Sequence, residues 1–147
     1  MRISIPIFTF ETSLILISIV LLRCSDNEKV SPEKKAAVNS ALHWVALIDS
    51  GRYEESWQVA FASFKEDVTQ RQWRIGLEQI REPYGTVMSR KIKETKNLAS
   101  KQSRSPQKNL VVEFTTQFEN QQVATEFVTV LLDNDGRWRV SAYYLDR

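Results

Sequence analysis

Glu126 is the residue whose surroundings in this sequence most strongly suggest chemistry. It stands in a segment rich in β-branched residues, where the alternate residues Ala124, Val128 and Val130 would share its face. An unpaired carboxylate among apolar neighbours is costly, so such a group either has a shifted pKa, as catalytic acids do, or has a cationic partner. Glu126 is therefore either an acid–base catalyst or one half of a buried ion pair.

The two interpretations require different partners. As a catalyst of the isomerase or dehydratase type, Glu126 would work with Tyr143 or His43 in an apolar pocket. As a structural group it would pair with Arg81 or Arg90 and fix the last helix to the sheet. The polar residues available for catalysis are few, so we expect the structural pair, and the sequence favours a protein that is not an enzyme.

Most other kinds of site are excluded by residue types that the sequence lacks. His43 is the only histidine and Cys24 the only cysteine. A multi-histidine zinc site is therefore excluded, and so is a disulfide or a thiolate metal site within the domain. The sequence also contains no glycine-rich phosphate loop and no nucleophile elbow. We expect neither a metal nor a cofactor.

The charge balance argues against nucleic acid as a partner. Lys and Arg number 20 against 18 Asp and Glu, which gives a formal net charge of +2. That excess is too small to indicate nucleic-acid binding. One local concentration of cations runs from Arg90 to Lys108 and includes Lys101 and Arg104. It is either a contact for anions or lipid headgroups or, as we favour, a solvated loop that protects a sheet edge.

Residues 1–24 have the pattern of a signal sequence or membrane anchor. The mostly apolar run 3–22 is long enough to cross a bilayer. Cys24 follows it, as in the lipidation site of bacterial lipoproteins, but Arg23 stands where that site needs a small residue. Lipidation at Cys24 and an uncleaved anchor both stay open, with residues 25–30 as a spacer. We expect a cell-envelope protein, exported or membrane-anchored, with the periplasmic side favoured.

Residues 31–147 are expected to form one domain whose first half is helical. Apolar residues recur with helical spacing, and this periodicity predicts three helices, over 31–48, 52–62 and 69–82. Asp49, Ser50 and Gly51 would end the first helix.

Three tryptophans fall in these predicted helices. Trp44, Trp57 and Trp73 lie at stripe positions and are most simply core residues. The alternative is that they line a ligand pocket together with Phe114.

From Thr86 onward the period changes to two, which predicts four strands. The expected strands cover 87–95, 110–118, 123–132 and 137–145. Helices followed by an antiparallel meander indicate an α+β domain, with three N-terminal helices packed on a curved four-stranded antiparallel sheet and preceded by an apolar N-terminal leader helix.

The second half and the helical block together resemble a known bacterial family. The residues that carry the resemblance are Ala41, Leu42, Trp44, Leu47, Ile48, Asp49, Gly51, Tyr53, Ser56, Trp57, Phe64, Lys65, Val68, Gln72, Trp73, Arg81, Pro83, Gly85, Ser89, Arg90, Phe114, Thr116, Phe118, Glu126, Gly136, Trp138 and Tyr143. Over residues 38–144 the chain looks like the domain-of-unknown-function family numbered 4019, which implies an exported or membrane-attached bacterial protein and no assigned activity. The order of elements is also similar to the cone-shaped fold of nuclear transport factor 2 and ketosteroid isomerase.

These observations lead to one functional expectation and two alternatives. We expect a non-enzymatic envelope domain that binds a protein partner or small apolar ligand, or forms a homodimer through its open sheet face. The alternatives are the acid–base enzyme centred on Glu126 and a membrane-surface or anion-binding module that uses residues 90–108.

Overall fold

The computed structural model describes residues 30–97, 107–120 and 123–146 of the chain. The predicted leader, with Cys24, lies outside the described residues, as do Lys101 and Arg104 of the cationic segment. Within the described ranges, no helix is both long enough and apolar enough to cross a bilayer.

The domain begins with helix α1, Pro32–Asp49, close to the predicted range. The Ser31 hydroxyl caps it by accepting a hydrogen bond from the backbone N–H of Lys34 at 3.1 Å. Gly51, with φ of 70°, takes the left-handed conformation that ends the helix. The buried face of α1 consists of Ala37, Ala41, Trp44, Val45, Leu47 and Ile48.

Two short helices, α2 (Tyr53–Gln58) and α3 (Ala62–Asp67), follow where one helix is expected over 52–62. The prediction of three helices over residues 31–82 is therefore wrong, since the described residues before the sheet form four α-helices. The break has a tertiary cause, because the Phe61 backbone N–H donates to the Val140 carbonyl of the sheet at 2.8 Å. A continuous helix would need that N–H for its own hydrogen-bond ladder.

The additional helix places one more aromatic side chain in the core. Phe64 of α3 is 8 % exposed, and its ring meets those of Trp44 and Trp73 edge-on, with centroids 6.4 and 4.9 Å away. Edge-to-face aromatic packing of this kind stabilises the fold beyond the area it buries.

Helix α4, Gln70–Arg81, starts with a capping box between Thr69 and Gln72, close to the predicted range 69–82. It continues into the short 3₁₀ helix η1, Glu82–Tyr84. Its apolar stripe is narrow, because Leu77 is buried but Ile80 is 42 % exposed.

Four antiparallel strands form one sheet in the order β1-β2-β3-β4. The strands are β1 (Val87–Lys96), β2 (Asn109–Phe118), β3 (Val123–Leu132) and β4 (Trp138–Asp146). In the register, Phe114 of β2 lies opposite Glu126 of β3, and Arg90 of β1 lies opposite Thr116 of β2. β1 and β4 are the two edges.

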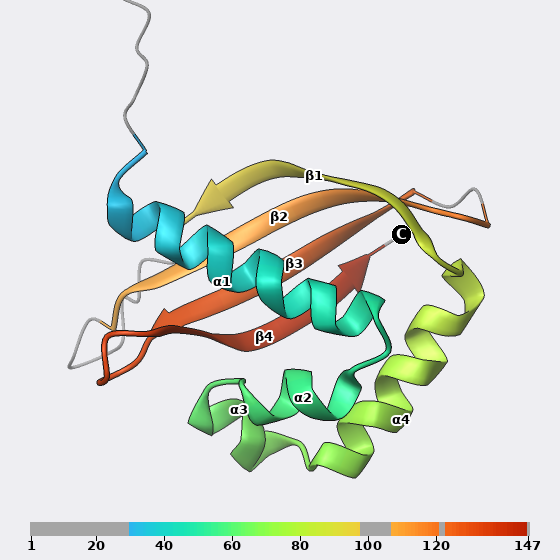
Figure 1. Ribbon diagram of the computed structural model, residues 1–147, viewed down its shortest axis with the longest axis horizontal. Coiled ribbons are helices and arrows are strands. Elements are labelled where there is room, and N and C mark those ends of the chain that lie inside the picture. The colour runs from blue at the N-terminus through green and yellow to red at the C-terminus, as the bar shows by residue number, and fades with distance from the viewer. Residues whose placement is uncertain (1–29, 98–106, 121–122, 147) are drawn as a thin grey trace, which may run out of the picture.

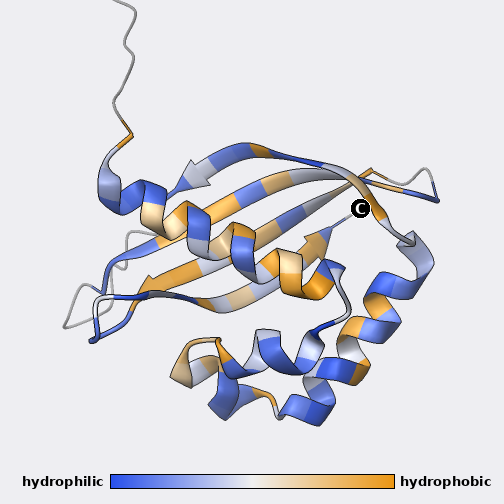
Figure 2. Cartoon of the chain, viewed as in Figure 1, coloured by the Kyte–Doolittle hydropathy of each residue, from blue (hydrophilic) through white to orange (hydrophobic). Residues whose placement is uncertain are grey.

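Helix α1 lies across one face of the sheet, and α2, α3 and α4 lie beyond it on the β4 side (Figure 1). Apolar, orange segments occur along α1 and along the central strands (Figure 2). The main core cluster includes Ala37, Ala41, Trp44, Val45, Ile48, Leu77, Leu110, Val112, Phe114, Val128, Val130 and Val140. The opposite face of the sheet is covered by none of the described elements (Figure 1).

Candidate functional site

Polar side chains from six elements converge between the helix ends and the inner face of the sheet. We call this group the Glu126 cluster. Its members are Asp49 of α1, Arg81 of α4, Arg90 of β1, Thr116 of β2, Glu126 of β3 and Tyr143 of β4.

Two arginines and two carboxylates of the Glu126 cluster form a closed ring of ion pairs. Arg81 bridges Glu126, at 3.0 Å from Nη1 to Oε1, and Asp49, at 2.7 Å from Nη2 to Oδ1. Arg90 bridges the same two acids from the other side, at 2.6 Å from Nε to Glu126 Oε2 and 2.5 Å from Nη1 to Asp49 Oδ2. The four formal charges cancel within the ring.

Two neutral hydroxyls complete the environment of Glu126. Tyr143 donates its hydroxyl to Oε1 at 2.7 Å, and Thr116 donates its hydroxyl to Oε2. Each carboxylate oxygen of Glu126 therefore accepts two hydrogen bonds. A carboxylate has about four lone-pair sites, so its accepting capacity is filled.

Local structure explains how these residues meet. Asp49 and Arg81 are the last residues of α1 and α4, so the ends of both helices point at the sheet. Glu126 faces inward with Ala124, Val128 and Val130 because the side chains of a strand alternate. The cross-strand register then places Arg90 beside Thr116 on that same inner face.

The arginines of the ring also rest on aromatic side chains. The Arg81 guanidinium carbon lies 4.8 Å from the Phe118 ring centroid, and that of Arg90 lies 5.8 Å from the Phe114 ring centroid. A cation over an aromatic face is attracted by the ring, more strongly where water is excluded. Phe114 is fully buried and thus supports the cluster from the sheet side.

Burial and charge shift the pKa values of the cluster in opposite ways. Burial alone would raise the pKa of Glu126, but Arg90, aided by Thr116 and Tyr143, holds it below the ordinary value. Burial likewise opposes the charge on Arg90, yet its bonds to Asp49 and Glu126 raise its pKa. The pKa of the Tyr143 phenol is raised by burial and then by the Glu126 charge.

This arrangement holds Glu126 as an anion that takes no proton near neutral pH. Its side chain is 0 % exposed, and both of its oxygens are already occupied by donors. A general base needs an open lone pair within reach of a substrate proton. The arrangement is suited to joining six elements and is unsuited to proton transfer.

Tyr143 and His43, the other two residues proposed for catalysis, lie in different parts of the domain. Tyr143 joins the Glu126 cluster, as described, with its hydroxyl hydrogen committed to the carboxylate. His43 is exposed on α1 and lines a surface hollow with Trp138 and Arg139 at the β4 side. No described hydrogen bond joins His43 to Glu126.

The tryptophans proposed as pocket residues pack into the helical layer. Trp44 donates its indole N–H to the Ser56 carbonyl at 2.7 Å, and Trp73 donates to the Ser56 hydroxyl at 2.9 Å. Trp57 donates to the Val68 carbonyl at 2.7 Å. Each N–H is thus satisfied by backbone or a neighbouring helix residue, as core tryptophans require.

Hollows indent the surface of the described part of the domain, among them one at the start of α1, one beside α4 and one between α1 and β4. These three have volumes of about 440, 540 and 350 Å³. The second of them, lined by Asp49 and Arg81 among others, reaches the outer side of the ion-pair ring. Glu126, Tyr143 and Phe114 line none of the three. Among the described residues, no three His, Cys, Asp or Glu side chains gather as metal ligands.

Sequence reasoning missed two members of the Glu126 cluster. Asp49 was interpreted only as a turn residue at the end of a helix, although it supplies the second acid of the ring. Thr116 lies in the predicted strand 110–118, and the sequence gives it no role there beyond the family resemblance. The available signal for Thr116 was a hydroxyl among large apolar residues, which is costly to bury without a partner.

The fold and the Glu126 cluster define an α+β domain in which a helical layer is joined to an antiparallel sheet by buried ion pairs. The chain belongs to the family described as proteins of unknown function, DUF4019, whose model matches residues 40–143. That range contains every member of the Glu126 cluster. No curated protein matches the chain.

Proposed function

We propose that this chain is a non-enzymatic interaction domain of the bacterial cell envelope, held at the membrane by its leader. The saturated environment of Glu126 carries the non-enzymatic part of the proposal. The buried carboxylate has both oxygens bound by internal donors, and none of the three surface hollows reaches it. An acid–base enzyme would need this group open to substrate.

We also infer that the domain is a relative of the cone-shaped nuclear transport factor 2 and ketosteroid isomerase fold. The order of helices before an antiparallel meander supports this relation. In enzymes of that fold an apolar pocket holds the catalytic carboxylate or histidine. In this chain the corresponding interior is filled by the Glu126 cluster and the rings of Trp44, Trp73 and Phe64. The filled interior is consistent with a scaffold that binds at its surface.

The envelope location rests on the sequence of residues 1–24. Their apolar run and the following Cys24 support either lipidation at that cysteine or an uncleaved anchor. Fractionation of cells, with mass spectrometry of the mature N-terminus, tests both forms. We expect the chain in the membrane fraction, with Cys24 acylated or the leader intact. Recovery of the chain in the cytoplasmic fraction with an unmodified N-terminus would contradict the proposal.

The partner surface we propose is the uncovered face of the sheet, and its occupant is a second copy of the chain. Val123 and Tyr144 are 60 % and 61 % exposed, and the rings of Phe127 and Tyr144 lie 6.1 Å apart. The middle of this face carries Thr125 and Thr129 of β3 and, beside Phe127, the Glu113 carboxylate of β2, which Lys93 neutralises at 2.6 Å. An aromatic patch whose neighbouring acid is already paired within the chain is compatible with a protein interface.

A matched pair of charged substitutions tests this dimer. Tyr144→Glu puts a carboxylate on the uncovered sheet face, whereas Ile80→Glu makes a similar change on exposed α4. Sedimentation of the full chain in density-matched detergent gives the mass of each protein. We expect a dimer for the unmodified chain and for Ile80→Glu, and a monomer for Tyr144→Glu. A monomeric unmodified chain would rule out the dimer.

A further inference from the structure

One end of the domain carries both the entry of the chain and the openings of two hairpins. The start of α1 lies at the same end of the sheet as the arrowhead of β1 and the start of β2 (Figure 1). The end of β3 and the start of β4 lie there as well (Figure 1). We call this the tether end, because the chain that precedes Val30 leads to the leader.

The tether keeps this end of the domain close to any membrane that holds the leader. Residues 25–31 separate Cys24 from the first residue of α1. Seven residues span at most about 25 Å when fully extended. The first turn of α1 therefore stays within about 25 Å of the bilayer surface. A domain without the tether would have no such limit on its distance from the membrane.

Among its described residues, the tether end has more cations than acids. Its described acids are paired, Glu33 with Lys108 and both Asp133 and Asp135 with Arg139. Lys34 and Lys35 lie in the first turns of α1, and neither has an ion-pair partner among the described residues. Lys108, at the start of β2, is 62 % exposed although it pairs with Glu33 at 2.7 Å. Basic residues close to a membrane are attracted by anionic lipids over about a Debye length.

The described strand cations of the segment proposed from the sequence, residues 90–108, do not form one surface. Arg90 points inward to the ion-pair ring, and Lys93 on the other face of β1 pairs with Glu113 at 2.6 Å. Lys96 pairs with Glu94 at 2.7 Å. These three strand cations have acidic partners among the described residues, whereas Lys34 and Lys35 at the tether end have none.

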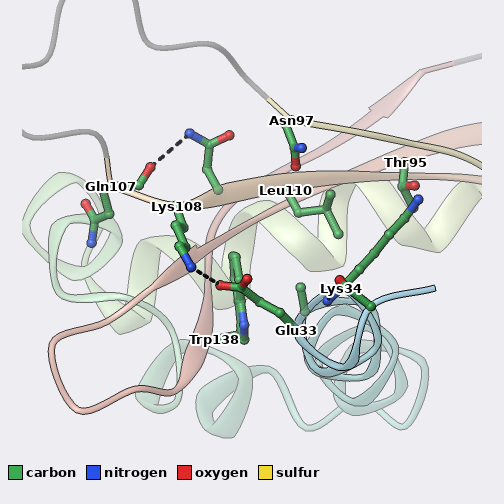
Figure 3. Close-up of a pocket in the computed structure, with 11 residues that line it drawn as sticks. Glu33, Lys34, Thr95, Asn97, Gln107, Lys108, Leu110 and Trp138 are labelled. Carbon is green, nitrogen blue, oxygen red and sulfur yellow. Dashed lines mark hydrogen bonds and ion pairs between the residues drawn. The ribbon is translucent and has the colours of Figure 1, made fainter. Parts of the chain in front are cut away.

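A hollow of about 440 Å³ opens between the cations of the tether end. Figure 3 shows Lys34, Lys108 and Glu33 around it, with the Lys108 ammonium on the Glu33 carboxylate, and Leu110 and Trp138 form its apolar floor. A charged rim with one more cation than acid, over an apolar and aromatic floor, suits a group that is itself anionic at one end and apolar at the other. Tryptophan is enriched at the bilayer interface for this reason.

We propose that the tether end docks on the anionic lipid surface of the membrane that holds the leader. Lys34 and Lys108 receive a headgroup phosphate, and the floor formed by Leu110 and Trp138 receives the glycerol region below it. This proposal rests on the membrane attachment proposed above. It adds an orientation, because docking at the tether end leaves the uncovered sheet face free for a second copy.

Hydrogen exchange on the full chain in vesicles tests the docking. One set of vesicles is phosphatidylcholine, and the other is equal parts phosphatidylcholine and phosphatidylglycerol. We expect slower amide exchange in the anionic vesicles for the first turn of α1 and for residues 107–110, with no change in α4. The variant K34E/K35E reverses two charges without threatening the fold, because acids in the first turn of a helix are stabilising.

The two lysines set the size of the effect. At about 1 kcal/mol for each cation near an anionic surface, K34E/K35E lowers the ratio of docked to undocked chain by about thirtyfold or more. The matched control R71E/K91E makes the same change of charge on α4 and on the outer face of β1, both exposed. It retains the lipid-dependent protection.

The outcomes separate docking from attachment. The docking proposal is overturned if amide exchange is the same in both kinds of vesicle. The proposed membrane attachment still stands in that case if alkaline carbonate does not extract the chain from the vesicles. Equal exchange is also the result expected if the cations serve an acidic protein partner. Docking is supported if anionic vesicles slow the amide exchange of the unmodified chain but not that of K34E/K35E. If alkaline carbonate also extracts the chain from the vesicles, the proposed attachment through the leader is overturned. Loss of protection in both double variants overturns a specific role for the tether end.

Discussion

Glu126→Gln distinguishes a structural carboxylate from a catalytic one. Glutamine keeps the size of the side chain but removes its charge and replaces one acceptor oxygen by an NH₂ donor. In either orientation that NH₂ faces groups that now donate to Glu126: Arg81 and Tyr143 on one side, or Arg90 and Thr116 on the other. The substitution therefore leaves buried donors without an acceptor.

The cost follows from the burial of the ring. Removing one partner of a buried ion pair costs about 3 to 5 kcal/mol, and Asp49 still neutralises one arginine, so we expect a loss of about 3 kcal/mol. At about 4 °C of melting temperature for each kcal/mol in a domain of this size, the melting temperature falls by about 12 °C. A catalytic glutamate would instead lose activity with little change in stability.

Thermal unfolding followed by tryptophan fluorescence measures this shift, since the Trp44 ring lies 5.5 Å from the Tyr143 ring, next to the cluster. Glu113→Gln is the matched control. It makes the same change on β2, where the partners Lys93 and Lys96 are 56 % and 58 % exposed, and it should move the melting temperature far less. A melting temperature for Glu126→Gln equal to that of Glu113→Gln would refute the reasoning.

Three further predictions concern the same cluster. Tyr143→Phe removes one donor to the buried carboxylate and should lower the free energy of unfolding by about 1.5 to 3 kcal/mol in urea titration; no loss would show that the hydroxyl bond is dispensable. Arg90→Lys keeps the charge but cannot bridge Asp49 and Glu126 through a planar fork, so chemical unfolding should show a loss of about 1 to 2 kcal/mol; full stability would mean that charge alone suffices. Because the folded pKa of Glu126 is lowered from 4.5, its contribution is complete above that pH and is lost as the pH falls through the folded pKa. The stability gap between the unmodified chain and Glu126→Gln should therefore be constant near neutrality and shrink below pH 4.5, and a gap that is independent of pH would contradict the assignment.

Most of the secondary structure can be predicted from the sequence because its local signals are strong. The predicted end of the first helix at Asp49 to Gly51 and the change from helical to alternating periodicity after Gly85 both have counterparts in the structure. The break between α2 and α3 could not be predicted in the same way. It depends on the hydrogen bond from Phe61 to Val140, a residue far along the chain.

The Glu126 cluster could also be predicted in part, because the local sequence around Glu126 gives a strong signal. A carboxylate at position 126 among alternating apolar residues requires a cation, and the sequence narrows that cation to Arg81 or Arg90. The structure uses both arginines, and it does so because Asp49 supplies a second negative charge. Asp49 ends a helix, and no local pattern distinguishes an aspartate that ends a helix from one that also pairs across the domain.

The central claim is that Glu126 and its arginines act as one structural unit, and a double-mutant cycle between Glu126 and Arg90 tests it most directly. The free energies of unfolding of the unmodified chain, Glu126→Gln, Arg90→Met and the double variant give the coupling energy. We predict a coupling of about 2 to 3 kcal/mol, with the double variant no less stable than Glu126→Gln alone, because removing both partners leaves no unpaired buried charge. Additive losses, with no coupling between the two sites, would contradict the account.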